Sequence, residues 1–160
     1  MNEIKKDNYN LYLIPSTRFK TISIGLTFRT DDSPEDSIYR ALLKEILLSG
    51  TGKYKKINEY NKACLELYNP SIHINTNVYG KDRSFCLGGQ FASEKYTEKG
   101  MNKKSIKLIL DTLYDPKVES GAFDKKNFEI VKHNYIEGLK AMKDHPMAYS
   151  KMRFYEELKV

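Results

Sequence analysis

Two stretches near the start of the chain, residues 11–14 and 21–30, are apolar in pattern, and in the second the apolar positions alternate with polar ones. Both stretches are rich in β-branched and apolar side chains and have a proline-containing turn between them, so they predict a strand, a turn and a second strand. A similar pattern returns at residues 72–78 and 84–92 and predicts a second strand pair, with a bulge at residues 88–89.

Apolar residues at helical spacing predict four helices between and after these strands. The first covers residues 33–49, with its N-cap at the first position and a glycine beyond its end. The second covers residues 56–68 and the third residues 101–114. The last segment, residues 123–159, is helical in pattern with a break near Pro146. Strands followed by helices, twice over, indicate an α+β fold with a mainly antiparallel sheet packed against helices.

Three apolar helix faces supply the predicted core of a single domain that spans residues 1–160. The faces consist of Ile38, Ala41, Leu42, Ile46 and Leu47 or Leu48 in the first helix, Ile57, Tyr60, Cys64, Leu65 and Tyr68 in the second, and Ile106, Ile109, Leu110 and Leu113 in the third. The chain ends within a helical pattern, so we expect this domain to be truncated at its C-terminal end.

The charge balance limits the class of partner. A net charge of +6 arises from 27 basic and 21 acidic residues, and only 5 of the basic residues are Arg. Specific phosphate and base recognition favours the Arg fork, so a nucleic-acid partner is not predicted. The apolar runs are too short to span a membrane, and the polar start lacks a signal-type apolar core, so we expect a cytoplasmic protein.

The cysteines and histidines form no recognised metal or nucleophile motif. Cys64 and Cys86 lack CxxC spacing and stand in partly apolar company, which favours buried free thiols. His73, His133 and His145 fall in a strand, a helix and a helix break, with no i,i+4 pair among them. No metal site is predicted from these residues.

The segment Gly50-Thr-Gly-Lys53 contains the Gly-Lys pair of a P-loop but lacks its frame. A P-loop needs GxxxxGK followed by Ser or Thr, in a loop that enters a helix. Here Tyr54 follows the lysine, Leu47 holds the place of the first glycine, and the loop leaves a helix. We therefore predict no nucleotide and no other cofactor.

The order of elements resembles the N-terminal part of the insulinase-like (inverzincin, M16) peptidases, over nearly the whole chain. The matching features are a strand pair ending at residues 28–30, a helix ending at residues 47–51, a second helix, and a strand pair that begins at Ile72. Residues 40–43 and 128–153 are similar to the bacterial branch of the family that lacks the zinc motif.

The resemblance implies a degenerate catalytic helix. Active members carry HxxEH just before the Gly-Thr, where two His on one helical face hold Zn²⁺ and the Glu takes a proton from the metal-bound water. Counting back from Gly50-Thr51, these positions are Ala41, Lys44 and Glu45. None of the three replacements supplies the residue that the zinc chemistry requires.

The third zinc ligand in such enzymes is a Glu on a later helix, the second of two acids seven residues apart. The similarity of residues 128–132 to that helix places the pair at Val131 and Gly138, with Glu137 as an alternative if the register shifts by one. Even with Glu137 the ligand set would be incomplete. We expect a metallopeptidase-like helix pair without a metal.

The function that the resemblance implies is that of a non-catalytic domain or subunit. In the family such a domain forms part of a chamber that encloses peptides, and inactive members pair with an active HxxEH-bearing partner; a homo-oligomer is the other expected assembly. Substrate adds as an extended strand near the zinc helix, which points to the strand at residues 72–78 and to His73, Asn75 and Asn77 as peptide-binding residues.

Two other functions remain open at this point. One is an active zinc-dependent peptidase with an unusual metal site. The other is a basic binding module for an acidic partner, resting on the lysine clusters.

Overall fold

A computed structural model describes residues 1–31, 34–79 and 82–158 of the chain. Its elements are β1 (Asn2–Lys6), β2 (Tyr9–Leu13), β3 (Thr21–Asp31), α1 (Pro34–Leu47), α2 (Ile57–Glu66), β4 (Ser71–Tyr79), β5 (Asp82–Ala92), α3 (Met101–Tyr114), β6 (Val118–Glu119), β7 (Ala122–Phe123), α4 (Lys125–Met142) and α5 (Pro146–Leu158). The expected α+β class with antiparallel strands is confirmed.

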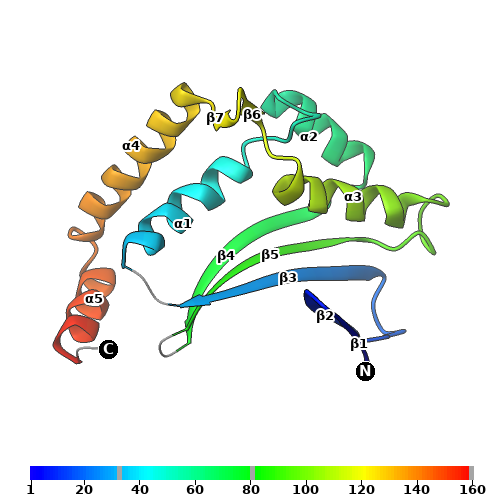
Figure 1. Cartoon of the computed structure of the whole chain (residues 1–160), viewed down its shortest axis with the longest axis horizontal. Helices are drawn as coiled ribbons and strands as arrows, with labels where there is room; N and C mark the ends of the chain where they lie inside the picture. The colour runs from blue at the N-terminus through cyan, green and yellow to red at the C-terminus, as the bar shows by residue number, and fades with distance from the viewer. Residues whose placement is uncertain (32–33, 80–81, 159–160) are drawn as a thin grey trace.

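The central sheet has three antiparallel strands in the order β3-β5-β4. Helices α1, α2 and α3 cover one face of this sheet, and α4 and α5 continue outward beyond α1 (Figure 1). Among the described residues, β3 and β4 are therefore the two edges of the sheet. The arrangement places α1 beside β4 on one side and beside α4 on the other.

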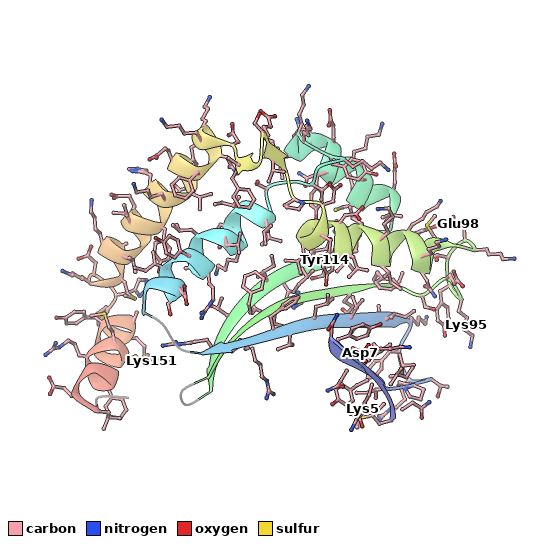
Figure 2. All side chains as sticks on the ribbon, viewed as in Figure 1. Lys5, Asp7, Lys95, Glu98, Tyr114 and Lys151 are labelled. Carbon is pink, nitrogen blue, oxygen red and sulfur yellow. The ribbon has the colours of Figure 1, made fainter. Side chains whose placement is uncertain are left out.

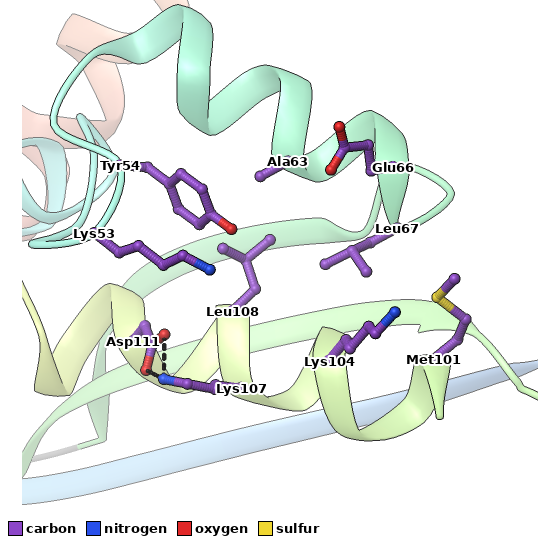
Figure 3. A pocket seen from close by; sticks show the side chains of 10 residues that line it. All are labelled: Lys53, Tyr54, Ala63, Glu66, Leu67, Met101, Lys104, Lys107, Leu108 and Asp111. Carbon is purple, nitrogen blue, oxygen red and sulfur yellow. Dashed lines mark hydrogen bonds and ion pairs between the residues drawn. The ribbon is translucent and has the colours of Figure 1, made fainter. Parts of the chain in front are cut away.

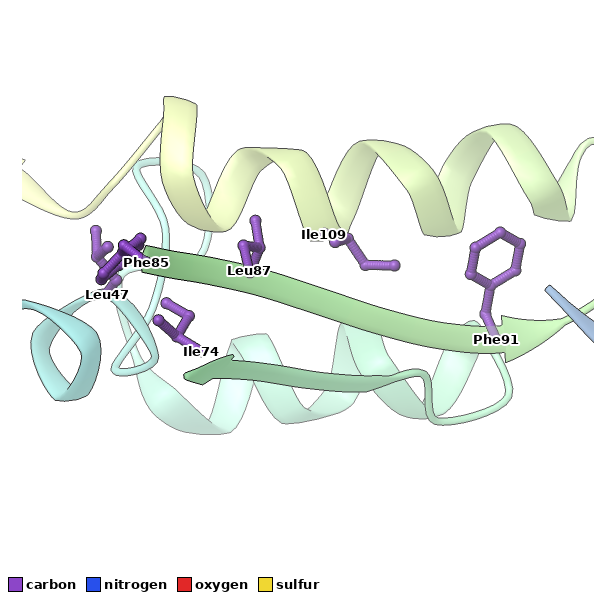
Figure 4. Packing of buried hydrophobic residues seen from close by; sticks show 6 residues of the cluster. All are labelled: Leu47, Ile74, Phe85, Leu87, Phe91 and Ile109. Carbon is purple, nitrogen blue, oxygen red and sulfur yellow. The ribbon is translucent and has the colours of Figure 1, made fainter. Parts of the chain in front are cut away.

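The core lies between the sheet and the helices. Its largest cluster joins buried residues of α1, β4, β5 and α3, as Figure 4 shows: Leu47, Ile74, Phe85, Leu87, Phe91 and Ile109. A second cluster joins Tyr60 and Cys64 of α2 to Leu108 of α3. Helix α3 thus packs on the sheet through Ile109 and on α2 through its neighbour Leu108.

The predicted bulge at Gly88 and Gly89 is wrong, because both residues keep regular pairing with β3 and β4. The two glycines instead allow close approach of other groups to β5. A Cβ at Gly88 would collide with the ring of His73, and one at Gly89 would come within 2.5 Å of Cδ1 of Ile109. The glycines therefore make space for the side chains of His73 and Ile109 and do not insert an extra residue into the strand.

The N-terminal strands differ from the prediction. Residues 2–6 form β1, which the sequence pattern did not predict, and β2 pairs with β1 rather than with β3. Every residue of this hairpin is exposed, and Figure 2 shows it, with Lys5 and Asp7 labelled, on the opposite side of the sheet from the helices. Strand β1 shows no apolar alternation, because four of its five residues are polar or charged and Ile4 alone is apolar.

Helix faces are partly mispredicted as well. Ile38, Ile57, Leu65 and Tyr68 are all more than half exposed, at 54%, 51%, 69% and 52%. Helix α2 ends at Glu66, earlier than expected, so Tyr68 lies beyond the helix. The buried residues near the end of the helix are Ala63 and Cys64. The short hairpin β6–β7 was also not predicted.

Other predictions are confirmed. Helix α3 has the predicted bounds, and the last segment breaks between α4 and α5 at Pro146. Two predicted features, the N-cap at Ser33 and the middle of the turn at residues 79–82, lie outside the described residues. No helix in the described part of the chain is both long and apolar enough to cross a membrane.

Candidate functional site

Helix α1 carries the three positions expected for a degenerate zinc motif. Ala41 and Lys44 are half-buried and Glu45 is exposed. The Nζ atom of Lys44 lies 3.4 Å from Oε1 of Glu45, so the ammonium group and the carboxylate form an ion pair at the helix surface. The chemistry that α1 offers at these positions is a methyl group and a mutually compensated pair of charges.

A groove of about 360 Å³ lies against α1 and α4. It is lined by Glu45, Val131, Asn134, Tyr135, Gly138 and Leu139. The groove thus brings together three of the positions singled out from the sequence, Glu45, Val131 and Gly138. The exposed Gly138 leaves it open, because a Cβ built there would have no atom within 4 Å.

The remaining lining residues were missed from the sequence. Asn134, Tyr135 and Leu139 occupy the same side of α4 as Val131 and Gly138, at helical spacing. The 3–4 residue spacing was the available signal, since Tyr135 is four residues from Val131 and Gly138 is three residues from Tyr135.

Two side-chain contacts fix α4 against the end of α1. Asp124 caps α4 by accepting a hydrogen bond from the amide of Asn127 at 2.7 Å. The side-chain amide of Asn127 donates to Oγ of Ser49 at 2.9 Å, and Ser49 in turn donates to the carbonyl of Ile46 at 2.6 Å. A polar chain therefore connects the first turn of α4 to the last turn of α1.

The residues at the groove do not fit a zinc ion. Glu45 is the one carboxylate among the lining residues, and it is paired with the Lys44 ammonium. The alternative third ligand, Glu137, is exposed and accepts a hydrogen bond from Lys140 at 2.8 Å. Across the described part of the chain, no group of three or more His, Cys, Asp or Glu residues could hold a metal. We therefore derive no metal-dependent step.

Strand β4 presents the three polar residues proposed for peptide binding. His73, Asn75 and Asn77 are exposed, whereas Ile74, on the opposite face, is 4% exposed and belongs to the core. The three polar side chains thus point to the face of the sheet that the helices leave open. What β4 offers along its edge is backbone, because it pairs with β5 on one side only.

The Gly-Thr turn after α1 is structural. The amide of Thr51 donates to the carbonyl of Tyr54 at 3.1 Å, and the amide of Gly52 donates to the carbonyl of Asp115 at 2.6 Å. Thr51 is fully buried and its Oγ1 accepts a bond from the Tyr54 amide. These amides are already used within the fold and are not available to cradle a phosphate.

The two cysteines are free thiols, as expected. Cys64 is buried against Tyr60 and Leu108, and burial raises the pKa of its thiol. A raised pKa keeps this group protonated and unreactive near neutral pH. Cys86 is only half-buried, and its sulfur accepts a hydrogen bond from Thr27 at 3.5 Å.

Comparisons with known proteins bear on this site. No family model matches the chain. The chain is 24% identical over 162 residues to a Bacillus subtilis (strain 168) protein named "Probable inactive metalloprotease YmfF", an alignment that includes 99% of this chain. This chain is its distant homologue. It spans 38% of the length of that protein, so it corresponds to a fragment of it.

A solved structure has the same fold. The crystal structure of a conserved protein from Enterococcus faecalis V583 matches with a TM-score of 0.87 and 19% identity, covering 96% of this chain and 37% of that one. The match shows that the fold is shared, and the homology to a protein named as a probable inactive metalloprotease agrees with the resemblance found in the sequence.

Proposed function

We propose that this chain is a non-catalytic metalloprotease-like domain that binds extended polypeptide along the free edge of β4 and contributes to a peptide-binding chamber. The observation that carries the proposal is the position of β4, an edge strand that runs beside the helix with the degenerate motif. An edge strand can gain a partner strand through backbone hydrogen bonds, and this needs no catalytic group.

The composition of α1 supports binding without hydrolysis. Ala41, Lys44 and Glu45 leave no pair of ligands on one helical face. Lys44 is ion-paired with Glu45 and supplies no carboxylate that could act as a general base. The name of the Bacillus subtilis homologue, which describes an inactive metalloprotease, agrees with this interpretation.

The expected partner is an active, HxxEH-bearing metallopeptidase subunit or a second copy of the chain. The support is the exposed apolar surface of the last two helices, where Ile130, Leu139, Met147 and Phe154 are 50%, 46%, 82% and 60% exposed. Apolar area of this kind favours burial against further polypeptide.

Proline substitutions at neighbouring positions of β4 test the binding edge. Amides of successive residues point to opposite sides of a strand, so of Asn75→Pro and Thr76→Pro one removes an amide facing β5 and the other an amide facing the free edge. The variant that loses the amide facing the free edge keeps the β4–β5 hydrogen bonds and is the more stable of the two. That variant should lose binding to labelled peptides of random sequence, with lengths matched to the nine residues of β4.

Fluorescence anisotropy measures the binding, and circular dichroism melting identifies the better-folded variant. Thr76→Val is the matched control, because it changes a side chain outside the proposed binding residues and keeps the amide; its binding should equal that of the parent. If the folded proline variant binds the peptides as the parent does, β4 is not the binding edge.

A further inference from the structure

A second cavity lies between α2, α3 and the turn that follows α1, on elements that take no part in the β4 edge or the α1–α4 groove. Its volume is about 330 Å³. It is lined by Lys53, Tyr54, Ala63, Glu66, Leu67, Met101, Lys104, Lys107, Leu108 and Asp111. This volume is at the small end of the range for ligand pockets, which favours a small molecule or a single residue.

The floor of the cavity is apolar and well packed. Leu108 is 4% exposed and Ala63 6% exposed. Leu108 belongs to the cluster with Tyr60 and Cys64, on which Leu67 also packs. The floor is therefore a fixed surface on which a short apolar chain could lie.

The rim of the cavity is charged. Nζ of Lys107 lies 2.7 Å from both carboxylate oxygens of Asp111, so that pair is compensated within the protein. The ammonium group of Lys53 lies 4.8 Å from the centroid of the Tyr54 ring, and a hydrogen bond with Tyr54 raises the pKa of Lys53. The contact with Tyr54 favours the charged form of Lys53.

Lys104 is the third lysine of the rim. Within the described ranges it forms no ion pair within 4 Å, and its charge contributes to lowering the pKa of Glu98, which does not line the cavity. Figure 3 shows the ammonium groups of Lys53 and Lys104 on opposite sides of Leu108. Among the lining residues Lys107 and Asp111 compensate each other, and Lys53, Lys104 and Glu66 together leave one net positive charge.

We propose that this cavity binds a small carboxylate attached to a short apolar chain. The carboxylate lies between Lys53 and Lys104, and the apolar chain lies on Ala63, Leu67 and Leu108. A single negative charge matches the single net positive charge of the rim, whereas the second charge of a phosphate would have no counterpart and would face Glu66. Both a fatty acid and the C-terminal residue of a peptide have this chemistry.

Titration of the full chain with sodium octanoate tests the proposal, followed by amide chemical shifts in ¹H–¹⁵N spectra. Saturable shifts are expected in α2, in α3 and in the turn at Lys53 and Tyr54, with a dissociation constant on the order of 1 mM. Octanamide, which keeps the chain and loses the charge, should cause less than about a tenth of this binding. Equal binding of the two probes, or no saturable shift up to about ten times that concentration, would overturn the proposal.

Charge variants separate the cavity from general attraction to a basic protein. Lys53→Gln and Lys104→Gln should each weaken octanoate binding by about threefold, and the double variant by on the order of tenfold. Lys103→Gln is the matched control, because Lys103 is an exposed neighbour on α3 outside the cavity. A double variant that binds like the parent, or a control that weakens binding equally, contradicts the site.

A peptide pair identifies the source of the carboxylate. An acetylated Gly-Gly-Leu with a free C-terminus is compared with the same peptide as its amide. Tighter binding of the free acid than of octanoate assigns the cavity to polypeptide C-termini, and binding of octanoate alone assigns it to fatty acids. Either result supports the carboxylate site and leaves the test of the β4 edge unaffected.

Discussion

Single residues decide how closely α3 approaches the sheet. Gly89 faces Ile109, which is fully buried, and Gly88 lies under the exposed ring of His73 on the other face. The two neighbouring glycines therefore meet a fixed side chain on one face and a movable one on the other. Replacement by alanine should therefore lower the free energy of unfolding by different amounts at the two positions.

Gly89→Ala is expected to lower the free energy of unfolding by about 1–3 kcal/mol, because the new methyl group overpacks the core against Ile109. Gly88→Ala should change it by about 0.5 kcal/mol or less, since the His73 ring can rotate into solvent. Urea denaturation of the two variants checks the difference. Equal losses would show that α3 can shift away from β5.

A hydrogen bond between Tyr68 and Glu98 sets the ionisation of both groups. The Tyr68 hydroxyl donates to Oε1 of Glu98 at 2.7 Å. This bond lowers the pKa of Glu98 and, together with Glu98's charge, raises the pKa of Tyr68. The lowered carboxyl pKa means that the contact stabilises the fold above the ordinary glutamate pKa and is lost as the pH falls through the lowered value.

For tyrosine the sign is the opposite. The pKa of Tyr68 is raised, so the stabilisation of the fold by this hydrogen bond is present below the ordinary tyrosine pKa. It is lost as the pH rises through the raised value. Tyr68→Phe should move the pKa of Glu98 upward towards its ordinary range, as measured by ¹³C titration of the side-chain carboxyl. An unchanged Glu98 titration in this variant would show that the bond does not persist in solution.

At the scale of elements, α4 packs mainly against α1. It has no buried residue among its 18 positions, and it is connected to α1 by the Asn127–Ser49 hydrogen bond and by the groove residues. Its stability thus depends strongly on its own helix propensity and on its Asp124 cap. A glycine in the middle of such a helix, here Gly138, therefore lowers the stability of the helix.

Gly138→Ala should raise the free energy of unfolding by about 0.5–1 kcal/mol, because alanine has the better helix propensity and its Cβ would meet no atom within 4 Å. Thermal unfolding followed by circular dichroism measures the gain. Gly100→Ala is the contrasting variant, since Gly100 has a φ of 89° at the N-cap of α3 and alanine is strained there. A loss of stability at Gly138 would indicate a role for its flexibility.

The elements that could be predicted are those whose ends carry explicit signals. Helix α3 was bounded correctly because Asp115 and Pro116 follow its last turn. Strand β1 was missed because its residues are all exposed and mostly polar, so no buried face marks the sequence. The burial of Leu108 was missed because α3 contacts two clusters, and a single apolar stripe describes only one of them.

The candidate site could be predicted only in part for a similar reason. Glu45 and Gly138 are 93 positions apart, and nothing in the local sequence says that they share a groove. The resemblance to a known order of elements supplied that information. Helical spacing from Val131 places Asn134 on the same side of α4, but only the packing of α4 against α1 shows that this side lines a groove.

For the molecule as a whole, the main expectation concerns metal. Purified protein should contain no stoichiometric zinc, because Ala41, Lys44 and Glu45 provide no ligand pair. Elemental analysis after purification in zinc-supplemented medium measures this. One tightly bound zinc in every chain would contradict the assignment of α1 as a degenerate helix.

Restoring the motif tests the same assignment from the other direction. Ala41→His, Lys44→Glu and Glu45→His together should raise zinc affinity, because two His four residues apart can hold one ion. Peptidase activity should stay weak, since Gly138 offers no third ligand. Full activity of the triple variant would show that the rest of the site is already present.

The hairpin of β1 and β2 has a consequence for the dynamics of the molecule. All ten of its residues are exposed, and within the described ranges it pairs with no strand of the central sheet. A two-stranded hairpin without a buried face is marginally stable, so it can open while β3, β4 and β5 stay intact. Hydrogen exchange of its amides should therefore report local opening rather than global unfolding, and the connection at residues 14–20 should be an early target of added proteases.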